Sequence, residues 1–176
     1  MALALASSAW SDMTEQTNLA VLTPSRKRLQ PGDIFAMLPP DGKYLFGSVI
    51  ATDARVGPME KLVLIYIYAS RSDDKQAGID LPLVVEDLLV PPTLTNRLPW
   101  SRGYFESIGT REISELDVMR PHWFKNRTYG TYFDAHSMPL SGPPDVPERL
   151  VGRQALNSYR TIDDSVSSAL GIPLVP

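Results

Sequence analysis

The chain contains no cysteine and only two histidines among its 176 residues. The lack of cysteine excludes disulfide bonds, thiolate nucleophiles and cysteine-ligated metals. Nucleophilic catalysis by serine or threonine needs a neighbouring histidine, and neither His122 nor His136 lies in a recognisable catalytic motif. Two isolated histidines also make a zinc site unexpected. The sequence therefore predicts no cofactor, no metal ion and no enzymatic activity.

Long apolar runs and a strong charge of one sign are also missing. No window approaches the roughly 18 uninterrupted apolar residues of a membrane span. The formal net charge of −3 gives little electrostatic attraction to a polyanion, so neither nucleic acid nor a membrane is expected as a partner. The first ten residues lack the basic start of a secretory signal. We expect a cytoplasmic protein.

A single domain is the expectation for a chain of this length. Residues 1–28 alternate small, polar and apolar types without a sustained period, and they end in a basic cluster at 26–28. This pattern predicts a flexible N-terminal arm that carries no nucleic-acid site, since three charges are few for counterion-driven binding. Residues 29–176 are expected to form the domain.

Two β-rich segments carry the clearest strand patterns. A hairpin is predicted from residues 33–37 and 44–50, joined by the Asp-Gly turn at 41–42. The run KLVLIYIYA at 61–69 is β-branched and aromatic almost throughout. Such a run is typical of a strand buried on both faces, and it is the candidate for the central strand.

A C-terminal helix is predicted within YRTIDDSVSSALGIP, residues 159–173. Thr161 is the expected N-cap, and Asp163 and Asp164 would then lie in the first turn, where the helix dipole favours negative charge. Four apolar residues share one face of this helix: Ile162, Val166, Ala169 and Leu170. The helix is therefore expected to dock on the sheet.

The remaining segments carry weaker patterns. They predict a strand at 102–110, a short helix at 113–121 and two short strands around Gly130. Residues 81–89 fit either a short helix or an edge strand, and the Pro/Gly-rich run at 141–153 predicts a surface connection. Together these elements predict an α+β fold: a strongly twisted, partly closed antiparallel β-sheet, small and barrel-like, with a few short helices including the C-terminal one.

Aromatic and basic residues are interleaved in the second half of the chain. The rings are Trp100, Tyr104, Phe105, Trp123, Phe124, Tyr129, Tyr132, Phe133 and Tyr159, and the cations are Arg97, Arg102, Arg111, Arg120, Lys125 and Arg127. This mixture is typical of protein interfaces, and it also suits single-stranded nucleic acid, whose bases stack on rings. The open alternative is that most of these rings belong to the core.

The stretch LQPGDIFAMLPPDGKYLFGSVI, residues 29–50, resembles the N-terminal signature of the immunity protein 26 family of bacterial polymorphic toxin systems. The matching positions are Gly32, Asp33, Ile34, Phe35, Asp41, Gly42, Tyr44, Gly47 and Val49. Residues 98–109 and 157–173 resemble further segments of this family, so the likeness covers about residues 29–173. A Gly-Asp-Ile/Val hairpin also opens small barrels of other kinds, including toxin endoribonucleases of the MazF/PemK class.

The resemblance implies a cytoplasmic antidote that binds a cognate toxin domain and blocks it without chemistry. The residues predicted to contact the toxin are Trp100, Arg102, Tyr104, Trp123, Arg160, Asp163 and Asp164. A mildly acidic protein would capture a basic toxin quickly, and buried aromatic anchors would slow its release. The alternative is a small-barrel RNA-binding or endoribonuclease-like protein, against which stand the pI of about 5.4 and the lack of a basic stripe.

Overall fold

A computed structural model describes residues 16–176, and its main element is a five-stranded antiparallel sheet of order β4-β3-β2-β1-β5. The strands are β1 (Asp33–Met37), β2 (Tyr44–Val56), β3 (Met59–Ser72), β4 (Thr93–Thr95) and β5 (Glu106–Thr110). The predicted hairpin is confirmed as β1 and β2. The run at 61–69 is confirmed as a strand paired on both sides, although the middle position of the sheet belongs to β2.

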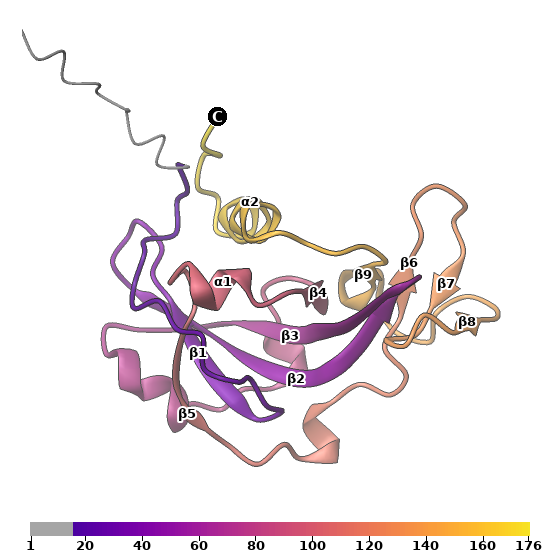
Figure 1. Cartoon of the computed structure of the whole chain (residues 1–176), viewed down its shortest axis with the longest axis horizontal. Helices are drawn as coiled ribbons and strands as arrows, with labels where there is room; N and C mark the ends of the chain where they lie inside the picture. Colours follow the sequence, from indigo (N-terminus) through magenta and orange to yellow (C-terminus); the bar gives the residue numbers. More distant parts are fainter. Residues whose placement is uncertain (1–15) are drawn as a thin grey trace, which may run out of the picture.

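Both faces of this large sheet are covered, which is why β3 is apolar on both sides. The helices α1 (Leu98–Ser101) and α2 (Tyr159–Ala169) lie over one face (Figure 1). The 3-10 turns η1 (Lys75–Ile79) and η2 (Val85–Asp87) pack on the other. Residues Leu62 to Tyr68 of β3 are consequently all buried.

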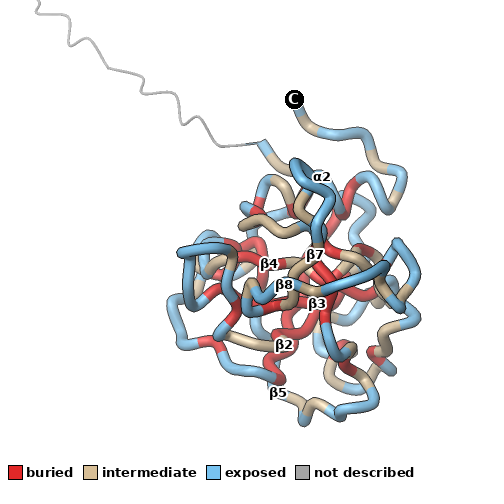
Figure 2. The backbone as a smooth tube through the Cα atoms, turned by 90° about the vertical axis from the view of Figure 1, so that its right-hand side faces the viewer, coloured by how far each residue is buried: buried red, intermediate tan, exposed pale blue. Residues whose placement is uncertain are grey.

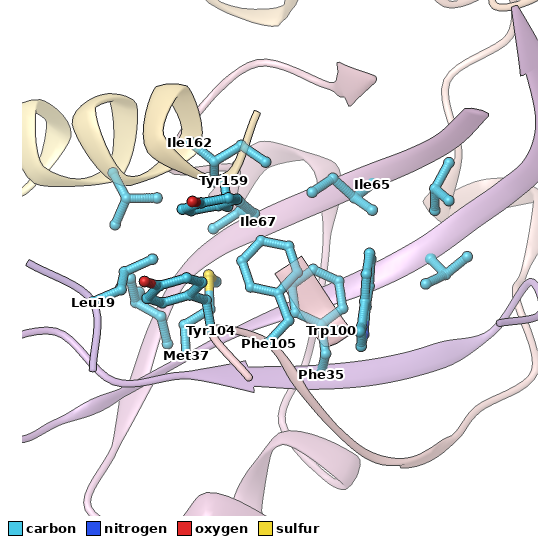
Figure 3. Close-up of a cluster of buried hydrophobic side chains, with 14 of the residues drawn as sticks. Leu19, Phe35, Met37, Ile65, Ile67, Trp100, Tyr104, Phe105, Tyr159 and Ile162 are labelled. Carbon is cyan, nitrogen blue, oxygen red and sulfur yellow. The ribbon is translucent and has the colours of Figure 1, made fainter. Parts of the chain in front are cut away.

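The close approach of a ring to the backbone explains one glycine of the hairpin. Phe35 in β1 lies opposite Gly47 in β2. A Cβ atom on Gly47 would lie 2.3 Å from the Phe35 ring and 2.6 Å from the Tyr66 carbonyl oxygen, so only glycine fits. The Phe35 ring also packs on Trp100 and Phe105, with centroids 5.2 and 4.5 Å away (Figure 3).

A second, four-stranded sheet of order β8-β7-β6-β9 lies at the far end of β2 and β3 (Figure 1). Its strands are β6 (Phe124–Lys125), β7 (Tyr132–Phe133), β8 (Pro139–Leu140) and β9 (Gly152–Arg153). The two short strands predicted around Gly130 are thus confirmed. The pair β6–β9 is parallel, whereas the sequence predicted an antiparallel sheet throughout. Phe124 packs on Leu64 and Leu94 and so joins the small sheet to the large one.

The elements predicted from weaker sequence patterns are only partly confirmed. Residues 81–89 contain the turn η2 and one isolated antiparallel bridge, between Leu88 and Tyr68, so they form neither an α-helix nor a full edge strand. The helix predicted at 113–121 is a three-residue 3-10 turn, η3 (Glu115–Asp117). The strand predicted at 102–110 begins at Glu106, because α1 and a turn occupy the residues before it. The sheet-rich α+β class is confirmed, but the described residues form no closed barrel and the predicted partial closure is not confirmed. In residues 16–176 no helix has the length and apolar character to cross a bilayer.

Helix α2 begins one turn earlier than its sequence pattern predicts. Its N-cap is Ser158, whose hydroxyl accepts a hydrogen bond from the Thr161 backbone N–H at 3.2 Å. Thr161 is therefore not the N-cap, and Asp163 lies beyond the first turn. Tyr159, the first residue of the helix, is buried and stacks on Tyr104 with ring centroids 4.9 Å apart, so the first turn also packs on the core. Ile162 and Val166 are buried as predicted, whereas Ala169, predicted on the same face, is exposed.

The N-terminal segment from residue 16 to residue 28 runs along the domain. The Ser25 backbone N–H donates to the Trp100 carbonyl at 2.9 Å, and the Leu22 N–H donates to the Gly103 carbonyl at 2.7 Å. Leu19 is only 3% exposed and belongs to the main core. The part of the predicted arm that the structure describes is therefore packed against the domain, and residues 1–15 lie outside the described residues.

Candidate functional site

The aromatic residues predicted to anchor a partner lie in the core. Trp100 packs edge-on against Phe35, and Tyr104 stacks on Tyr159 of α2 with ring centroids 4.9 Å apart (Figure 3). Trp123 is also buried, at the small sheet. Each of these rings is almost fully covered by its own chain, so it joins elements and offers little area to a partner. The alternative that most second-half rings belong to the core is confirmed.

Asp163 is a buried carboxylate that fastens the N-terminal segment to α2. Its two oxygens accept hydrogen bonds from the backbone N–H groups of Leu19, at 2.7 Å, and Asn18, at 3.0 Å. The Asn18 side chain donates in turn to the Ser167 hydroxyl at 2.9 Å. Hydrogen bonds to an ionised acceptor are among the stronger ones in proteins. The carboxylate of Asp163, 3% exposed, is thus used inside the chain.

Three of the seven predicted contact residues lie at the surface. Arg102 is exposed, with its guanidinium 5.9 Å from the centre of the Tyr159 ring. Arg160 and Asp164 are exposed on α2 and line a shallow hollow of about 340 Å³. These three side chains are accessible to a partner, and toxin contact through them remains a prediction.

A groove of about 720 Å³ opens between β9 and the first turns of α2, and Asp164 borders it as well. Its charged lining consists of three cations and two carboxylates: Lys125, Arg127, Arg153, Glu148 and Asp164. Three positive minus two negative charges leave one net positive charge, although the whole chain carries −3. We call this surface the basic groove.

Two cations of the basic groove are held side by side by the backbone. Lys125 of β6 and Arg153 of β9 are register partners in the parallel pair. The Gln154 N–H donates to the Lys125 carbonyl at 3.0 Å and fixes this register. Both side chains are exposed, and none of the ion pairs formed by residues 16–176 includes either of them. The Lys125 ammonium lies 6.0 Å from the centre of the Tyr132 ring. Like charges at opposed strand positions repel one another, so we expect this pair of cations to cost some stability.

The hairpin between β6 and β7 rises beside the basic groove and projects from the body of the molecule (Figure 1). Asn126 braces its turn: the side-chain oxygen accepts from the backbone N–H groups of Thr128 and Tyr129 at 3.0 and 3.1 Å. The Asn126 amide donates to Gln154 at 3.1 Å. Tyr129 at the tip is 80% exposed. Most residues in the loops around β7 and β8 are exposed or half-buried, with Ala135 as a buried exception, whereas the middle of the large sheet is buried (Figure 2).

His122 is buried and hydrogen-bonded to a tyrosine. The Tyr66 hydroxyl lies 2.6 Å from His122 Nε2, and it accepts a hydrogen bond from the Met119 N–H at 3.1 Å. Burial lowers the pKa of His122 to about 4, so the ring is neutral at pH 7 and can accept the tyrosine proton at Nε2. Burial also raises the pKa of Tyr66, which keeps its hydroxyl protonated. The pair therefore holds residues 119–122 on the large sheet.

A family model described as Immunity protein 26 matches residues 30–133. These are 104 of the 176 residues, and the chain belongs to the immunity protein 26 family. The match spans β1 to β5 and the β6–β7 hairpin, and it ends before β9 and α2. The predicted likeness at 157–173 lies outside it and remains a prediction. No curated protein and no solved structure matches the chain.

Two positions of the signature that predicted this family have a structural role. Asp33 accepts hydrogen bonds from the Gln30 N–H at 2.9 Å and the Thr110 hydroxyl at 3.0 Å, which fixes the start of β1. Gly47 makes room for Phe35. Asp33 and Gly47 are therefore needed for the start and the packing of the β1–β2 hairpin.

The basic groove was not predicted from the sequence. The interleaved aromatic and basic residues of the second half include Lys125, Arg127 and Tyr129. The sequence offered no reason to prefer these three over the other rings and cations. Arg153 lies in a segment predicted as a surface connection, and its pairing with β6 depends on a parallel register with no local pattern. The detectable signal was the turn Asn-Arg-Thr-Tyr-Gly at 126–130, with an aromatic residue in a polar loop. No group of three His, Asp or Glu side chains in residues 16–176 is placed to hold a metal ion.

Proposed function

We propose that this protein neutralises a cognate bacterial toxin domain by binding it, as a cytoplasmic antidote with no chemistry of its own. The observation that carries the proposal is membership of the immunity protein 26 family. Blocking a toxin by contact requires a surface that holds its shape, because ordering a loose surface on binding costs affinity.

The structure supports the proposal with a preformed, partly concave surface. The braced turn of the β6–β7 hairpin and the basic groove are fixed by backbone and amide hydrogen bonds within the chain. A stable complex buries about 800 Å² on each partner, so a contact surface normally combines several neighbouring features. The hairpin and the groove adjoin at Arg127, so one partner can cover both.

Co-expression tests the biological role. The toxin domain encoded beside this gene is induced in cells with and without the protein, and survival is compared. We expect growth only when the protein is present. Equal killing in both cultures contradicts an immunity function.

Stoichiometry tests the mechanism. Purified protein is titrated into a fixed amount of the toxin domain, and the residual toxin activity is measured. A binding antidote abolishes activity at about one equivalent, because each molecule covers one toxin. Complete loss at a small fraction of one equivalent would mean that the protein acts catalytically on the toxin, and it would overturn the proposal.

A further inference from the structure

We infer that the basic groove and the β6–β7 hairpin form the surface that receives the toxin, and that they receive an acidic segment of it. The inference rests on the proposed function and deepens it by naming a surface and the charge of the partner.

The first argument comes from the opposed cations. Lys125 and Arg153 are held in register on adjacent strands, and Arg127 lines the same groove. No carboxylate of residues 16–176 forms an ion pair with them, and the contact of the Lys125 ammonium with the Tyr132 ring, 6.0 Å from its centre, leaves the positive charges unneutralised. A carboxylate supplied by a partner would lie between two cations and would gain from both. An acidic peptide segment therefore fits this part of the groove.

The second argument comes from the hairpin tip, which is independent of charge. Tyrosine is a frequent anchor of protein interfaces because it covers a large area at a low cost in side-chain entropy. Tyr129 stands 80% exposed on a turn that Asn126 has already ordered. Because it is exposed to solvent, the Tyr129 ring does not take part in core packing. Its position beside the groove favours a protein partner that contacts both.

Local charge decides which partner fits, and here it differs from the charge of the whole chain. The net charge of −3 predicts a basic toxin. Interactions between exposed charges decay within a Debye length of roughly 8 Å at physiological salt, so the contact surface responds to its nearest charges. In the groove these are the three cations Lys125, Arg127 and Arg153, which outnumber the two carboxylates of its lining, Glu148 and Asp164. The segment that enters next to β6 and β9 is therefore acidic.

The test uses the full chain and the toxin domain encoded beside its gene. Lys125→Glu and Arg153→Glu are combined, which replaces one like-charged pair by another and so leaves the internal repulsion of the pair about unchanged. The matched control combines Arg26→Glu and Lys27→Glu, which changes the net charge equally on an exposed segment away from the groove. Association and dissociation rates are measured at low and physiological salt.

We expect the groove variant to lose affinity by roughly tenfold or more, with slower association and a weaker salt dependence. The control should stay within about twofold of wild type. Tyr129→Ala, a single change of an exposed side chain, should lose roughly tenfold through faster dissociation. Wild-type affinity in both the groove variant and Tyr129→Ala overturns the assigned surface while leaving the proposed function intact.

Two further outcomes separate the alternatives. If the wild-type protein fails to bind or protect against the toxin domain, the proposed function fails and the inference fails with it. A single-stranded RNA oligonucleotide serves as the second probe. Binding of this RNA by the wild type, lost in the groove variant but kept in the control, would assign the groove to nucleic acid and would overturn the acidic protein partner.

Discussion

The two sheets of this molecule differ in what their side chains do. The large sheet has strands of up to 14 residues, and its apolar residues pack on both faces. The small sheet has four strands of two residues each, and it carries exposed cations at Lys125 and Arg153. The side chains of the large sheet are mostly packed in the core, whereas the small sheet presents two like charges at opposed positions, which we expect to cost it some stability. We call the large sheet the scaffold, and we call the small sheet, to which the inference above assigns toxin binding, the contact surface.

The small sheet stays ordered because it is attached to the scaffold at several points. Phe124 is fully buried against Leu64 and Leu94. The Arg55 N–H at the end of β2 donates to the Ala135 carbonyl at 2.9 Å, and the Asn157 N–H donates to the Leu94 carbonyl at 2.8 Å. Two-residue strands form too few hydrogen bonds to be stable alone. Their order therefore comes from the scaffold, which allows their outer side chains to serve binding.

The largest expected effect is loss of core packing in the scaffold. Phe35→Ala removes a ring that fills the space over Gly47 and contacts Trp100, and it should lower the free energy of unfolding by about 3–5 kcal/mol. Urea denaturation measures this change. Tyr129→Ala is the matched control in the contact surface, and its effect should be within about 0.5 kcal/mol because the ring is exposed. If both variants lose similar amounts of unfolding free energy, the distinction between a stabilising scaffold and an exposed contact surface is wrong.

The next effect is a loss of stability in mild acid, caused by His122. Its pKa is about 4 in the folded protein and about 6.5 in the unfolded chain. Above pH 6.5 the ring is neutral in both states. As the pH falls from 6.5 to 4, the unfolded chain takes up a proton that the folded protein does not, so stability should fall by on the order of 3 kcal/mol.

Urea denaturation at a series of pH values between 7 and 4 measures this loss. His122→Gln should be less stable at pH 7, because it disturbs the bond to Tyr66, but its stability should depend less on pH. His136→Gln is the control, since the ring of this exposed histidine pairs with the exposed Asp53, and its charge is the smallest of the causes that lower the pKa of His122. A slope that His122→Gln leaves unchanged would show that other groups cause the acid sensitivity.

The scaffold was largely predictable from sequence, and the contact surface was not. The hairpin, β3 and α2 follow from local patterns: alternation, a β-branched run and an amphipathic period. The roles of individual polar residues follow from contacts distant in sequence. Asp163 fits a helix cap by position, yet its partners are Asn18 and Leu19, about 145 residues away. The pairing of Lys125 with Arg153 likewise depends on a parallel register that no local pattern encodes.

A third prediction concerns the clamp that holds the N-terminal segment on the scaffold. In Asp163→Asn, one carboxylate oxygen becomes an amide donor that faces a backbone N–H, so stability should fall by about 1–3 kcal/mol. Amide hydrogen exchange at Asn18 and Leu19 should speed up more than exchange in β3. The exposed Asp164→Asn is the control, with an expected change within about 0.5 kcal/mol. Unchanged exchange at residues 18 and 19 would contradict the clamp.

The smallest expected effect on stability is a gain, whereas the three variants above lose stability. It is also the effect most specific to the contact surface. Arg153→Glu places a carboxylate opposite Lys125 and replaces repulsion by attraction, so the free energy of unfolding should rise by about 0.2–1 kcal/mol. The same change should weaken toxin binding, since it removes a cation from the basic groove. Arg26→Glu, on the exposed N-terminal segment, should leave both quantities unchanged. A variant that is more stable but binds less tightly would show that the small sheet gives up stability for binding, whereas a loss of stability would mean that Arg153 is structural.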